Sequence, residues 1–288
     1  MSLDRHYAAL LIGANYENDK DSALSGCLND VDNVKNLLVN VFKWNDRDIT
    51  VLKEEQATKA NILNELTRFI QNANSHLQLN PSARIDLWLH YSGHGSQLSS
   101  SSPGEADRQD ETIVPYDYQT SGQITDSEIA NIMRHLNNNI HLTCVFDCCH
   151  SGTIMDLPYI ISDMSISSCT YKQERSGSRC RWNSSSNIVC LSGCRDKQTS
   201  ADYDGAGAMT TALLLVLKDH KYSLSIRTLM RDLRVALASD RLIKRGFKQI
   251  AQFSSNKMID QDTMFVCKDS RLRGEKTEVV VDCTFHSC

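Results

Sequence analysis

Two short segments of this sequence bring cysteine, histidine and glycine together in a way that could support nucleophilic chemistry. They are HYSGHG at residues 90–95 and DCCHSG at residues 147–152. A thiol attacks only as a thiolate, and a neighbouring imidazole can take its proton. His94 lies between two glycines, which let the backbone turn sharply, and Gly152 could free backbone N–H groups to face an oxyanion. A lone buried cysteine or histidine would need no such explanation, but two such clusters favour catalysis.

Apolar strands and amphipathic helices must position these segments. Continuous apolar runs predict strands at residues 7–13, 48–52, 84–90, 141–147, 188–193 and 263–267. Apolar residues at helical spacing predict helices at residues 30–42, 58–74, 126–136 (with Thr125 or Asp126 as cap), 208–219 and 224–240. Serine-rich and charged stretches predict surface loops at residues 96–110 and 162–187.

Strands that alternate with helices predict the α/β class, with a central, mostly parallel sheet and helices on both faces. In such sheets the functional site lies beyond the carboxyl ends of the strands. HYSGHG and DCCHSG each directly follow a predicted strand. We therefore expect both segments at the same edge of the sheet.

Composition narrows the functional class. The 288 residues are 41% apolar and 23% charged, which is ordinary for a globular protein. The net charge of −4 and the absence of a basic patch give no support for nucleic-acid binding. The 11 cysteines form no regular framework, which indicates reduced thiols and predicts a cytoplasmic protein. The apolar run near the N-terminus reads as a strand rather than a signal peptide, and no stretch reaches the length of a membrane span.

HYSGHG and DCCHSG resemble the catalytic motifs of the metacaspases, in the caspase-like clan of cysteine peptidases. Supporting motifs follow in the family's order: GCLNDV at 26–31, DET at 110–112, LPY at 157–159, SGC at 192–194 and QTSAD at 198–202. The resemblance implies a caspase-like three-layer sandwich and an endopeptidase with a thioester intermediate. The family's nucleophile directly precedes His-Ser-Gly, which makes it Cys149 here, with His94 as base. The family usually has serine at Cys148, so this second thiol is a candidate for oxidation.

Specificity is implied by a second set of residues. Asp147 lies two residues before Cys149, and residues two apart on a strand share a face. A carboxylate there can bind a cationic substrate side chain. The resemblance implies this role for Asp147 with Asp30 as its partner, and Cys27 and Ser92 as lining residues, so that the pocket favours Arg or Lys over Asp. Taken alone, Asp30 precedes an amphipathic helix and would be its N-cap, a role compatible with the first.

Calcium is implied only by the resemblance. Asp110, Asp126 and Asp156 are scattered along the chain, and alone they would be loop or cap residues. Many metacaspases require calcium, and these positions match its ligands, which suit a cation that prefers oxygen. The family usually has a further aspartate where this chain has Ser127, which should weaken calcium binding, and Glu128 is a candidate substitute.

The expected organisation is one peptidase domain with a short linker. The predicted parts are a domain at 1–268, divided into a catalytic half at 1–161, a linker at 162–187 and a C-terminal half at 188–268, and a polar tail at 269–288. The linker carries basic residues at which such a peptidase could cut itself: Lys172, Arg175, Arg179 and Arg181. A solvated loop explains these charges equally well. The short linker resembles type I metacaspases, although the sequence begins without the long extension that many of them have.

Two other readings stay open. A catalytically silent caspase-like scaffold or regulatory binding protein usually loses the histidine or the cysteine, and this chain keeps both. A zinc site from Cys148, Cys149 and His150 would use adjacent ligands, which rarely reach one tetrahedral ion. The sequence therefore predicts a calcium-activated cysteine endopeptidase that cleaves protein or peptide substrates after Arg or Lys. We expect a cytoplasmic monomer that binds neither nucleic acid nor membrane.

Overall fold

Five parallel strands form the centre of a large sheet in this computed structural model. The structure describes residues 5–99, 109–137, 139–148, 154–161, 173–175, 186–193, 202–203, 206–238 and 250–267. The parallel strands are β1 (Arg5–Gly13), β2 (Ile49–Lys53), β3 (Arg84–Ser92), β7 (Ile140–Asp147) and β10 (Asn187–Ser192). The sheet has eight strands in the order β2-β1-β3-β7-β10-β14-β8-β9. β3 and β7, which lead into the two chemical segments, are therefore neighbours at its centre.

Three antiparallel strands extend the sheet beyond β10. They are β14 (Gln252–Ser255), β8 (Tyr159–Ile161) and β9 (Gln173–Arg175). The sequence did not predict β14, because its residues are largely polar, yet all four are buried. β9 lies within the predicted linker at 162–187, of which the structure describes only residues 173–175 and 186–187. The predicted tail at 269–288 lies outside the described residues.

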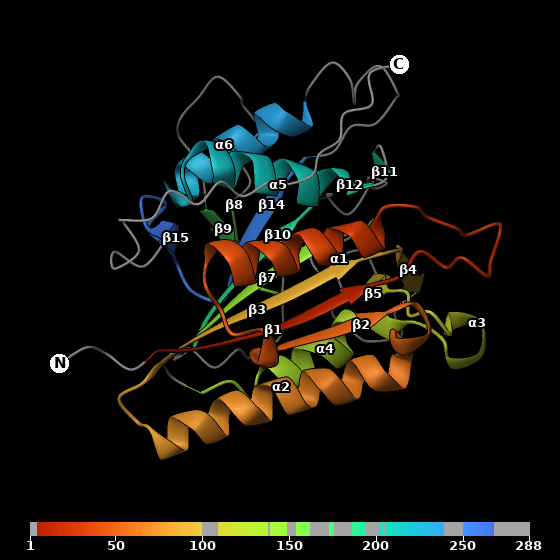
Figure 1. The fold of residues 1–288 in the computed structure, drawn as a ribbon, viewed down its shortest axis with the longest axis horizontal. Coiled ribbons are helices and arrows are strands. Elements are labelled where there is room, and N and C mark those ends of the chain that lie inside the picture. Colours follow the sequence, from red (N-terminus) through yellow and green to blue (C-terminus); the bar gives the residue numbers. More distant parts are fainter. Residues whose placement is uncertain are drawn as a thin grey trace.

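Helices cover both faces of the sheet (Figure 1). One face carries α1 (Cys27–Asn36), α5 (Ala208–Asp219) and α6 (Ile226–Leu237), and the other carries α2 (Lys59–Leu79) and α4 (Asp126–Met133). Successive strand residues point to opposite faces, so each layer has its own core. Trp88, Val145 and Leu191 belong to the first core, and Leu87 and Phe146 to the second. The predicted three-layer α/β class is confirmed.

The start of α1 differs from the prediction. The helix begins at Cys27, with Gly26 as an N-cap that offers no side chain. The Cys27 N–H donates instead to Asn15 Oδ1 at 2.9 Å. A side chain at Gly13 would place Cβ 2.7 Å from Val31 Cγ2, so this glycine lets α1 pack directly on β1. Asp30 lies inside the first turn and is fully buried, so the expectation that it caps the helix is wrong.

The remaining helix ends follow local capping chemistry. α2 starts after Thr58, whose side chain accepts from the Asn61 N–H. α4 starts with a capping box in which Thr125 and Glu128 exchange hydrogen bonds, so Thr125 rather than Asp126 is the cap. α1 continues into a π-helical turn, Leu37–Val41, and α6 begins after the Ser225 cap. α5 has the predicted bounds, whereas α2 runs past its predicted end and α4 and α6 are shorter than predicted.

Small elements surround these layers. The region predicted as a loop at 96–110 contributes β4 (Gly95–Ser99) and β5 (Gln109–Ile113), which pair with β6 (Ile124–Thr125). The predicted strand at 263–267 is β15 (Met264–Cys267), which pairs with β13 (Ser223–Ser225) outside the large sheet. The other short elements are the 3-10 turns Asp46–Asp48 and Glu54–Gln56, α3 (Tyr118–Ser121), β11 (Asp202–Tyr203) and β12 (Ala206–Gly207). No helix within the described ranges has both the length and the apolar character needed to cross a membrane.

Candidate active site

The pairing of β3 with β7 aligns the two chemical segments. Ser92, the last residue of β3, lies opposite Asp147, the last residue of β7. His94 and Cys149 each follow this pair by two residues. Cys149 lies outside the described residues, so the structure describes the predicted base but not the predicted nucleophile. The register nevertheless brings the two chain segments to the same point of the sheet edge.

The His94 imidazole is held in one orientation. Its Nε2 lies 2.7 Å from the carbonyl oxygen of Ser22. A carbonyl only accepts hydrogen bonds, so Nε2 carries the proton and Nδ1 of the neutral ring has the lone pair. The ring also stacks on Tyr16, with ring centres 4.9 Å apart and planes 29° from parallel. A base that a third group orients in this way is suited to activate a nucleophile.

Two buried tyrosines hold the backbone of His94. Its N–H donates to Tyr16 Oη at 3.1 Å, and its carbonyl accepts from Tyr91 Oη at 2.8 Å. Both hydroxyls also contact the carbonyl oxygen of Val114, at 2.6 Å from Tyr16 and 2.9 Å from Tyr91. These roles leave no signal in the sequence, because a tyrosine in or just after an apolar strand reads as a core residue.

The structure brings Asp30, Ser92 and Asp147 together on the α1 side of the sheet. Ser92 Oγ donates to Asp30 Oδ2 at 2.6 Å, and the Gly207 N–H lies 3.0 Å from both Asp30 oxygens. The Thr210 N–H donates to Asp147 Oδ2 at 2.7 Å. Asp30 is fully buried and Asp147 is 4% exposed. Hydrogen bonds from backbone N–H groups stabilise the charged form of both carboxylates.

The N-terminus of α5 is where both carboxylates meet. A Cβ on Gly207 would lie 2.5 Å from Asp30 Oδ2 and closer still to Asp147 Oδ2. Only glycine therefore fits between them at this position. The positive end of the α5 helix dipole favours two negative charges there. Cys27, also predicted to line this pocket, is buried one turn before Asp30 in α1.

The acidic set Asp110, Asp126 and Asp156 has a different character. Asp126 is fully buried at the start of α4, where it accepts from the N–H of Ser127 and, at 3.2 Å, from that of Glu111. Burial and the neighbouring Asp156 carboxylate raise the pKa of Asp126, and burial and Asp110 raise the pKa of Asp156. Asp110 Oδ1 is buried and has no hydrogen-bond partner among the described residues. The set therefore brings carboxyl groups together where burial and mutual repulsion disfavour their charge.

These acids are not arranged as a closed metal shell. In the part of the chain that the structure describes, no three Asp, Glu, His or Cys side chains are close enough to hold a metal ion. Their chemistry suits a hard cation, because buried carboxylates with raised pKa and an unpartnered oxygen favour a positive charge. The donor types therefore fit calcium, although the observed spacing does not.

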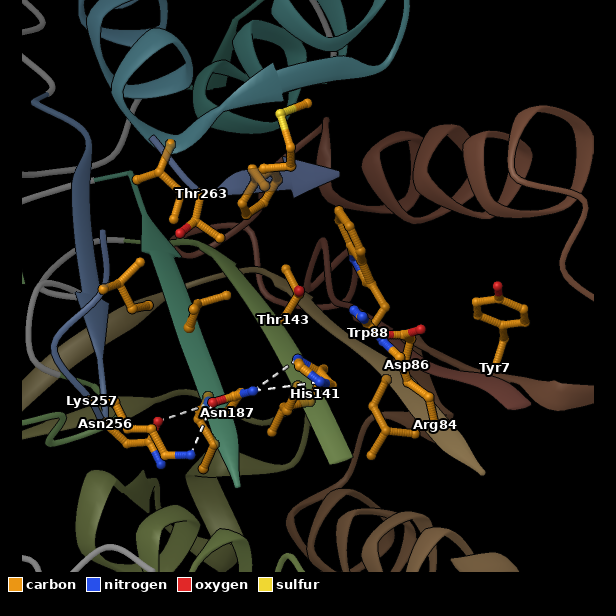
Figure 2. A pocket seen from close by; sticks show the side chains of 18 of the residues that line it. Tyr7, Arg84, Asp86, Trp88, His141, Thr143, Asn187, Asn256, Lys257 and Thr263 are labelled. Atoms are coloured by element: carbon orange, nitrogen blue, oxygen red, sulfur yellow. Dashed lines mark hydrogen bonds and ion pairs between the residues drawn. The ribbon is translucent and has the colours of Figure 1, made fainter. Parts of the chain in front are cut away.

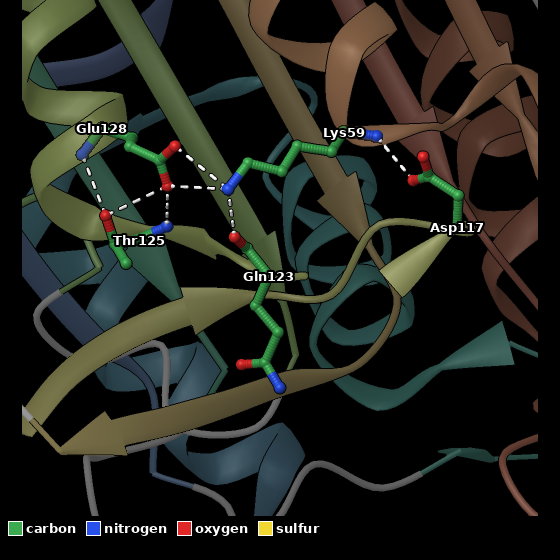
Figure 3. Close-up of polar contacts among 5 residues, drawn as sticks. All are labelled: Lys59, Asp117, Gln123, Thr125 and Glu128. Carbon is green, nitrogen blue, oxygen red and sulfur yellow. Dashed lines mark hydrogen bonds and ion pairs between the residues drawn. The ribbon is translucent and has the colours of Figure 1, made fainter. Parts of the chain in front are cut away.

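Glu128 does not belong to this acidic set (Figure 3). Its carboxylate accepts from the Thr125 N–H at 2.9 Å and forms an ion pair with Lys59 at 3.1 Å. Lys59 Nζ also donates to the Gln123 carbonyl at 2.7 Å, and its backbone N–H donates to Asp117 Oδ1 at 2.7 Å. Glu128 thus links the starts of α4 and α2, and the structure does not place it where it would replace the carboxylate missing at Ser127.

The second cysteine of DCCHSG faces the other core. Cys148 is a free thiol with no exposed surface, and it packs with Phe146 and Tyr91 on the side of α2 and α4. This burial makes it a core residue and protects it from oxidants. Cys149 and His150, the other two residues of the alternative zinc site, lie outside the described residues.

A cavity of about 580 Å³ lies at the opposite edge of the sheet, near the amino ends of the strands (Figure 2). Its walls include Tyr7, Trp88, His141 and Lys257. None of the predicted catalytic, specificity or calcium residues lines it. This cavity is therefore separate from the segments that carry the chemistry.

Comparison with known proteins identifies the family. Residues 8–158 match the family model described as "Metacaspase, peptidase C14 domain". The chain is 34% identical over 302 residues to Metacaspase-1 of Mycosarcoma maydis, covering 90% of this chain and 72% of that protein. It is 35% identical over 287 residues to Metacaspase-2 of Trypanosoma brucei brucei, covering 91% and 76%. This chain belongs to the metacaspase family.

Metacaspases are cysteine peptidases, and this member is therefore a cysteine peptidase that acts on protein substrates. A solved structure supports the fold. The crystal structure of protein GSU0716 from Geobacter sulfurreducens superposes with a TM-score of 0.59 at 21% identity, covering 88% of this chain and 95% of that one. The metacaspase prediction and the caspase-like α/β sandwich are thereby confirmed.

Proposed function

We propose that this metacaspase is an endopeptidase that cleaves after Arg or Lys, with Cys149 as nucleophile and His94 as base. The observation that carries the proposal is the register of β3 and β7, which sets His94 and Cys149 two residues beyond the same strand pair. Neighbouring strands are about 4.8 Å apart, within the range that a short turn can bridge. The Ser22 carbonyl leaves Nδ1 of His94 as the proton acceptor.

The reaction is acyl transfer. His94 takes the proton of Cys149, and the thiolate attacks the peptide carbonyl carbon to form a tetrahedral oxyanion. His94 then gives the proton to the leaving amine, a thioester remains, and water hydrolyses it. We assign the oxyanion to backbone N–H groups near Gly93 and Cys149. The Gly93 N–H makes only a long contact of 3.4 Å to the Asp147 carbonyl, which a stronger acceptor can replace.

Specificity for Arg or Lys rests on Asp30 and Asp147. Their carboxylates lie against the same glycine, and N–H and hydroxyl donors keep them charged. Two adjacent negative charges attract a guanidinium or ammonium group and repel an acidic side chain. Cys27 and Ser92 complete the pocket that we propose.

Calcium is proposed as the activator, held by Asp110, Asp126 and Asp156. The raised pKa values and the unpartnered Asp110 oxygen support a cation here. When bound, calcium would neutralise the repulsion within the set. We further propose a cytoplasmic monomer that can cut itself within residues 162–187.

The test is turnover of peptides that differ only in the residue before the cleaved bond, with and without calcium. We expect cleavage after Arg and Lys, none after Asp, and stimulation by calcium. Cys149→Ala and His94→Ala should each remove activity by several orders of magnitude, while Cys148→Ala, the matched control, should keep it. Full activity in Cys149→Ala would disprove the nucleophile, and a preference for Asp would disprove the pocket.

A further inference from the structure

The residues around His94 include a pair of tyrosines that the peptidase mechanism does not use. Tyr16 follows β1 and Tyr91 lies near the end of β3, and each is 1% exposed. Their hydroxyl oxygens are 3.2 Å apart. Between them they contact the N–H and the carbonyl of His94 and the carbonyl of Val114. The peptide groups on both sides of the His94 side chain are thus fixed by two phenols.

The direction of each hydrogen bond follows from counting protons. A phenol has one proton to donate. The shortest contact, 2.6 Å, assigns the Tyr16 proton to the Val114 carbonyl, so the Tyr16 oxygen accepts from the His94 N–H. The Tyr91 proton goes to the His94 carbonyl at 2.8 Å. The Val114 N–H lies 3.0 Å from that carbonyl and 3.2 Å from the Tyr91 oxygen, so the two oxygens share it. Both hydroxyls therefore donate and accept, and each links the two backbone segments.

The phenols keep these protons over the working pH range. Burial raises the pKa of both Tyr16 and Tyr91 above the ordinary value of a phenol. Neither group ionises where a peptidase works, so the hydrogen-bond pattern does not change with pH. The hydrogen bonds that hold the His94 backbone therefore do not depend on pH.

The backbone at Tyr16 is strained. Tyr16 has φ of 55°, a left-handed conformation that costs a residue with a Cβ about 1–3 kcal/mol. The Glu54 carboxylate holds this turn by accepting from the N–H of Asn15 at 2.7 Å and of Tyr16 at 3.2 Å. A Cβ at Gly93 would lie 2.7 Å from Tyr91 Oη and 3.0 Å from Tyr16 Oη. The glycine that precedes His94 thus makes room for both hydroxyls.

We propose that Tyr16 and Tyr91 are positioning residues that fix the His94 imidazole for proton transfer. Tyr16 acts twice, through its hydroxyl on the His94 N–H and through its ring beneath the imidazole. With the backbone fixed on both sides and the ring stacked, Nε2 stays on the Ser22 carbonyl and Nδ1 stays directed away from it. The inference rests on the proposed Cys149–His94 chemistry and extends it to two residues that act only through His94.

The experiment compares Tyr16→Phe and Tyr91→Phe with the unmodified full chain. Phenylalanine keeps the ring and removes only the hydroxyl. We expect kcat on an Arg peptide to fall about tenfold in each variant, with KM changed less than about twofold, because misplacing the base affects proton transfer rather than substrate binding. Tyr222→Phe, a half-buried tyrosine that packs against Phe42, is the matched control and should leave kcat unchanged.

A second readout separates positioning from general structural damage. The alkylation rate of Cys149 by iodoacetamide is followed against pH by mass spectrometry. An unaided thiol ionises near pH 8.5, so alkylation near pH 7 depends on His94 and alkylation above about pH 9 does not. We expect the two hydroxyl variants to slow the reaction near pH 7 and to leave it unchanged at high pH.

Each outcome decides a different point. If His94→Ala reacts as fast as the unmodified chain near pH 7, the proposed chemistry falls, and the tyrosine roles fall with it. If His94→Ala is slow but both tyrosine variants match the unmodified chain, the tyrosine proposal alone is wrong. A uniform loss of rate at every pH, parallel to a loss of folded protein, also overturns it. Should Tyr16→Phe not fold, Tyr91→Phe carries the test.

Discussion

Asp30 and Asp147 lie against the N-terminus of α5, whereas Asp110, Asp126 and Asp156 gather around the start of α4. The first pair receives hydrogen bonds from Gly207, Thr210 and Ser92. In the second set, burial and mutual repulsion raise the pKa of Asp126 and Asp156. Both groups are buried aspartates close to the predicted site, yet the fold supplies hydrogen-bond donors to the first pair, whereas burial and mutual repulsion disfavour the charge of the second set.

This difference indicates which of the two groups requires a bound cation to stabilise its charge. Donors that belong to the fold already stabilise the pair at α5, so it can stay charged without a ligand and attract a cationic side chain. The set at α4 lacks such donors for part of its oxygen atoms, as the unpartnered Asp110 oxygen shows within the described residues. Its charge becomes favourable only when a cation binds. The same substitution should therefore have opposite effects in the two places.

The largest effect is expected from Asp147→Asn. The variant keeps the shape and the acceptor for the Thr210 N–H but removes one charge from the pair. Truncating one partner of a desolvated charge pair costs about 2–5 kcal/mol, so kcat/KM for an Arg peptide should fall about 100-fold or more. A peptide with neutral citrulline in place of Arg should lose little. Equal rates on the Arg and citrulline peptides with the unmodified enzyme would contradict the proposed pocket.

Gly207→Ala should disrupt the same pair by steric conflict. The added methyl would lie 2.5 Å from Asp30 Oδ2 and closer to Asp147, and neither carboxylate is free to withdraw from its donors. We expect destabilisation of about 3 kcal/mol, at the upper end for overpacking, measured by urea unfolding. Gly122→Ala is the control, because nothing lies within 4 Å of a Cβ there and only its φ of 73° opposes the change. A loss in Gly207→Ala no larger than that in Gly122→Ala would contradict the steric conflict with the two carboxylates.

His90 lies two residues before Ser92 on β3 and shows whether hydrogen-bond partners are also present further from the end of the strand. It is fully buried between Leu11 and Val145, and neither ring nitrogen has a partner among the described residues. Burial lowers its pKa from 6.5 to about 3. Between these values the unfolded chain binds the proton more readily, so the stabilisation is complete above pH 6.5 and is lost as the pH falls.

The expected loss attributable to His90 is about 2 kcal/mol between pH 6.5 and 5, from a slope of about 1.4 kcal/mol per pH unit. The free energy of unfolding in urea is measured at both pH values for the unmodified chain and for His90→Leu. The difference between their losses on acidification is the contribution of His90. His90→Leu should lose less stability on acidification. Identical losses would mean that His90 is already paired or solvated.

The smallest effect, and the opposite sign, is expected from Asp126→Asn. Its pKa is raised in the folded state, so ionisation destabilises the calcium-free protein progressively as the pH rises above about 4. Removing the ionisable carboxyl should stabilise the calcium-free protein at pH 8. The same variant should lose the increase in melting temperature that calcium gives the unmodified chain. Destabilisation without calcium would mean that Asp126 is already neutralised.

The pattern of apolar residues predicted the sheet and its helices well, and it failed where the buried residues are polar. β14 was missed because Gln252–Ser255 reads as a loop, and its burial depends on strands distant in the sequence. β4 and β5 were missed because polar residues in a small antiparallel sheet carry no apolar signal. The position of Asp30 was misjudged because Asn15, twelve residues from Cys27, serves the start of α1 instead of a local cap.

Family motifs, rather than local pattern, grouped the candidate site residues. The structure brings Asp30, Ser92 and Asp147 together, and Cys149 lies outside the described residues. Tyr16, Gly207 and the Ser22 carbonyl were not predicted, since each acts through a backbone group or from a remote turn. Such contributions depend on three-dimensional proximity and leave no residue-type signature.

The salt bridge between Lys59 and Glu128 has a consequence for how the molecule tolerates change. A single ammonium group joins the first turns of two helices, because Lys59 and Glu128 form an ion pair although they are 69 residues apart in the chain. Acetylation of Lys59 would abolish its charge and remove one of the contacts that hold the start of α4, whose first residue is Asp126. The acidic set could then be loosened from the outside of the protein, by chemistry that never enters the peptidase centre.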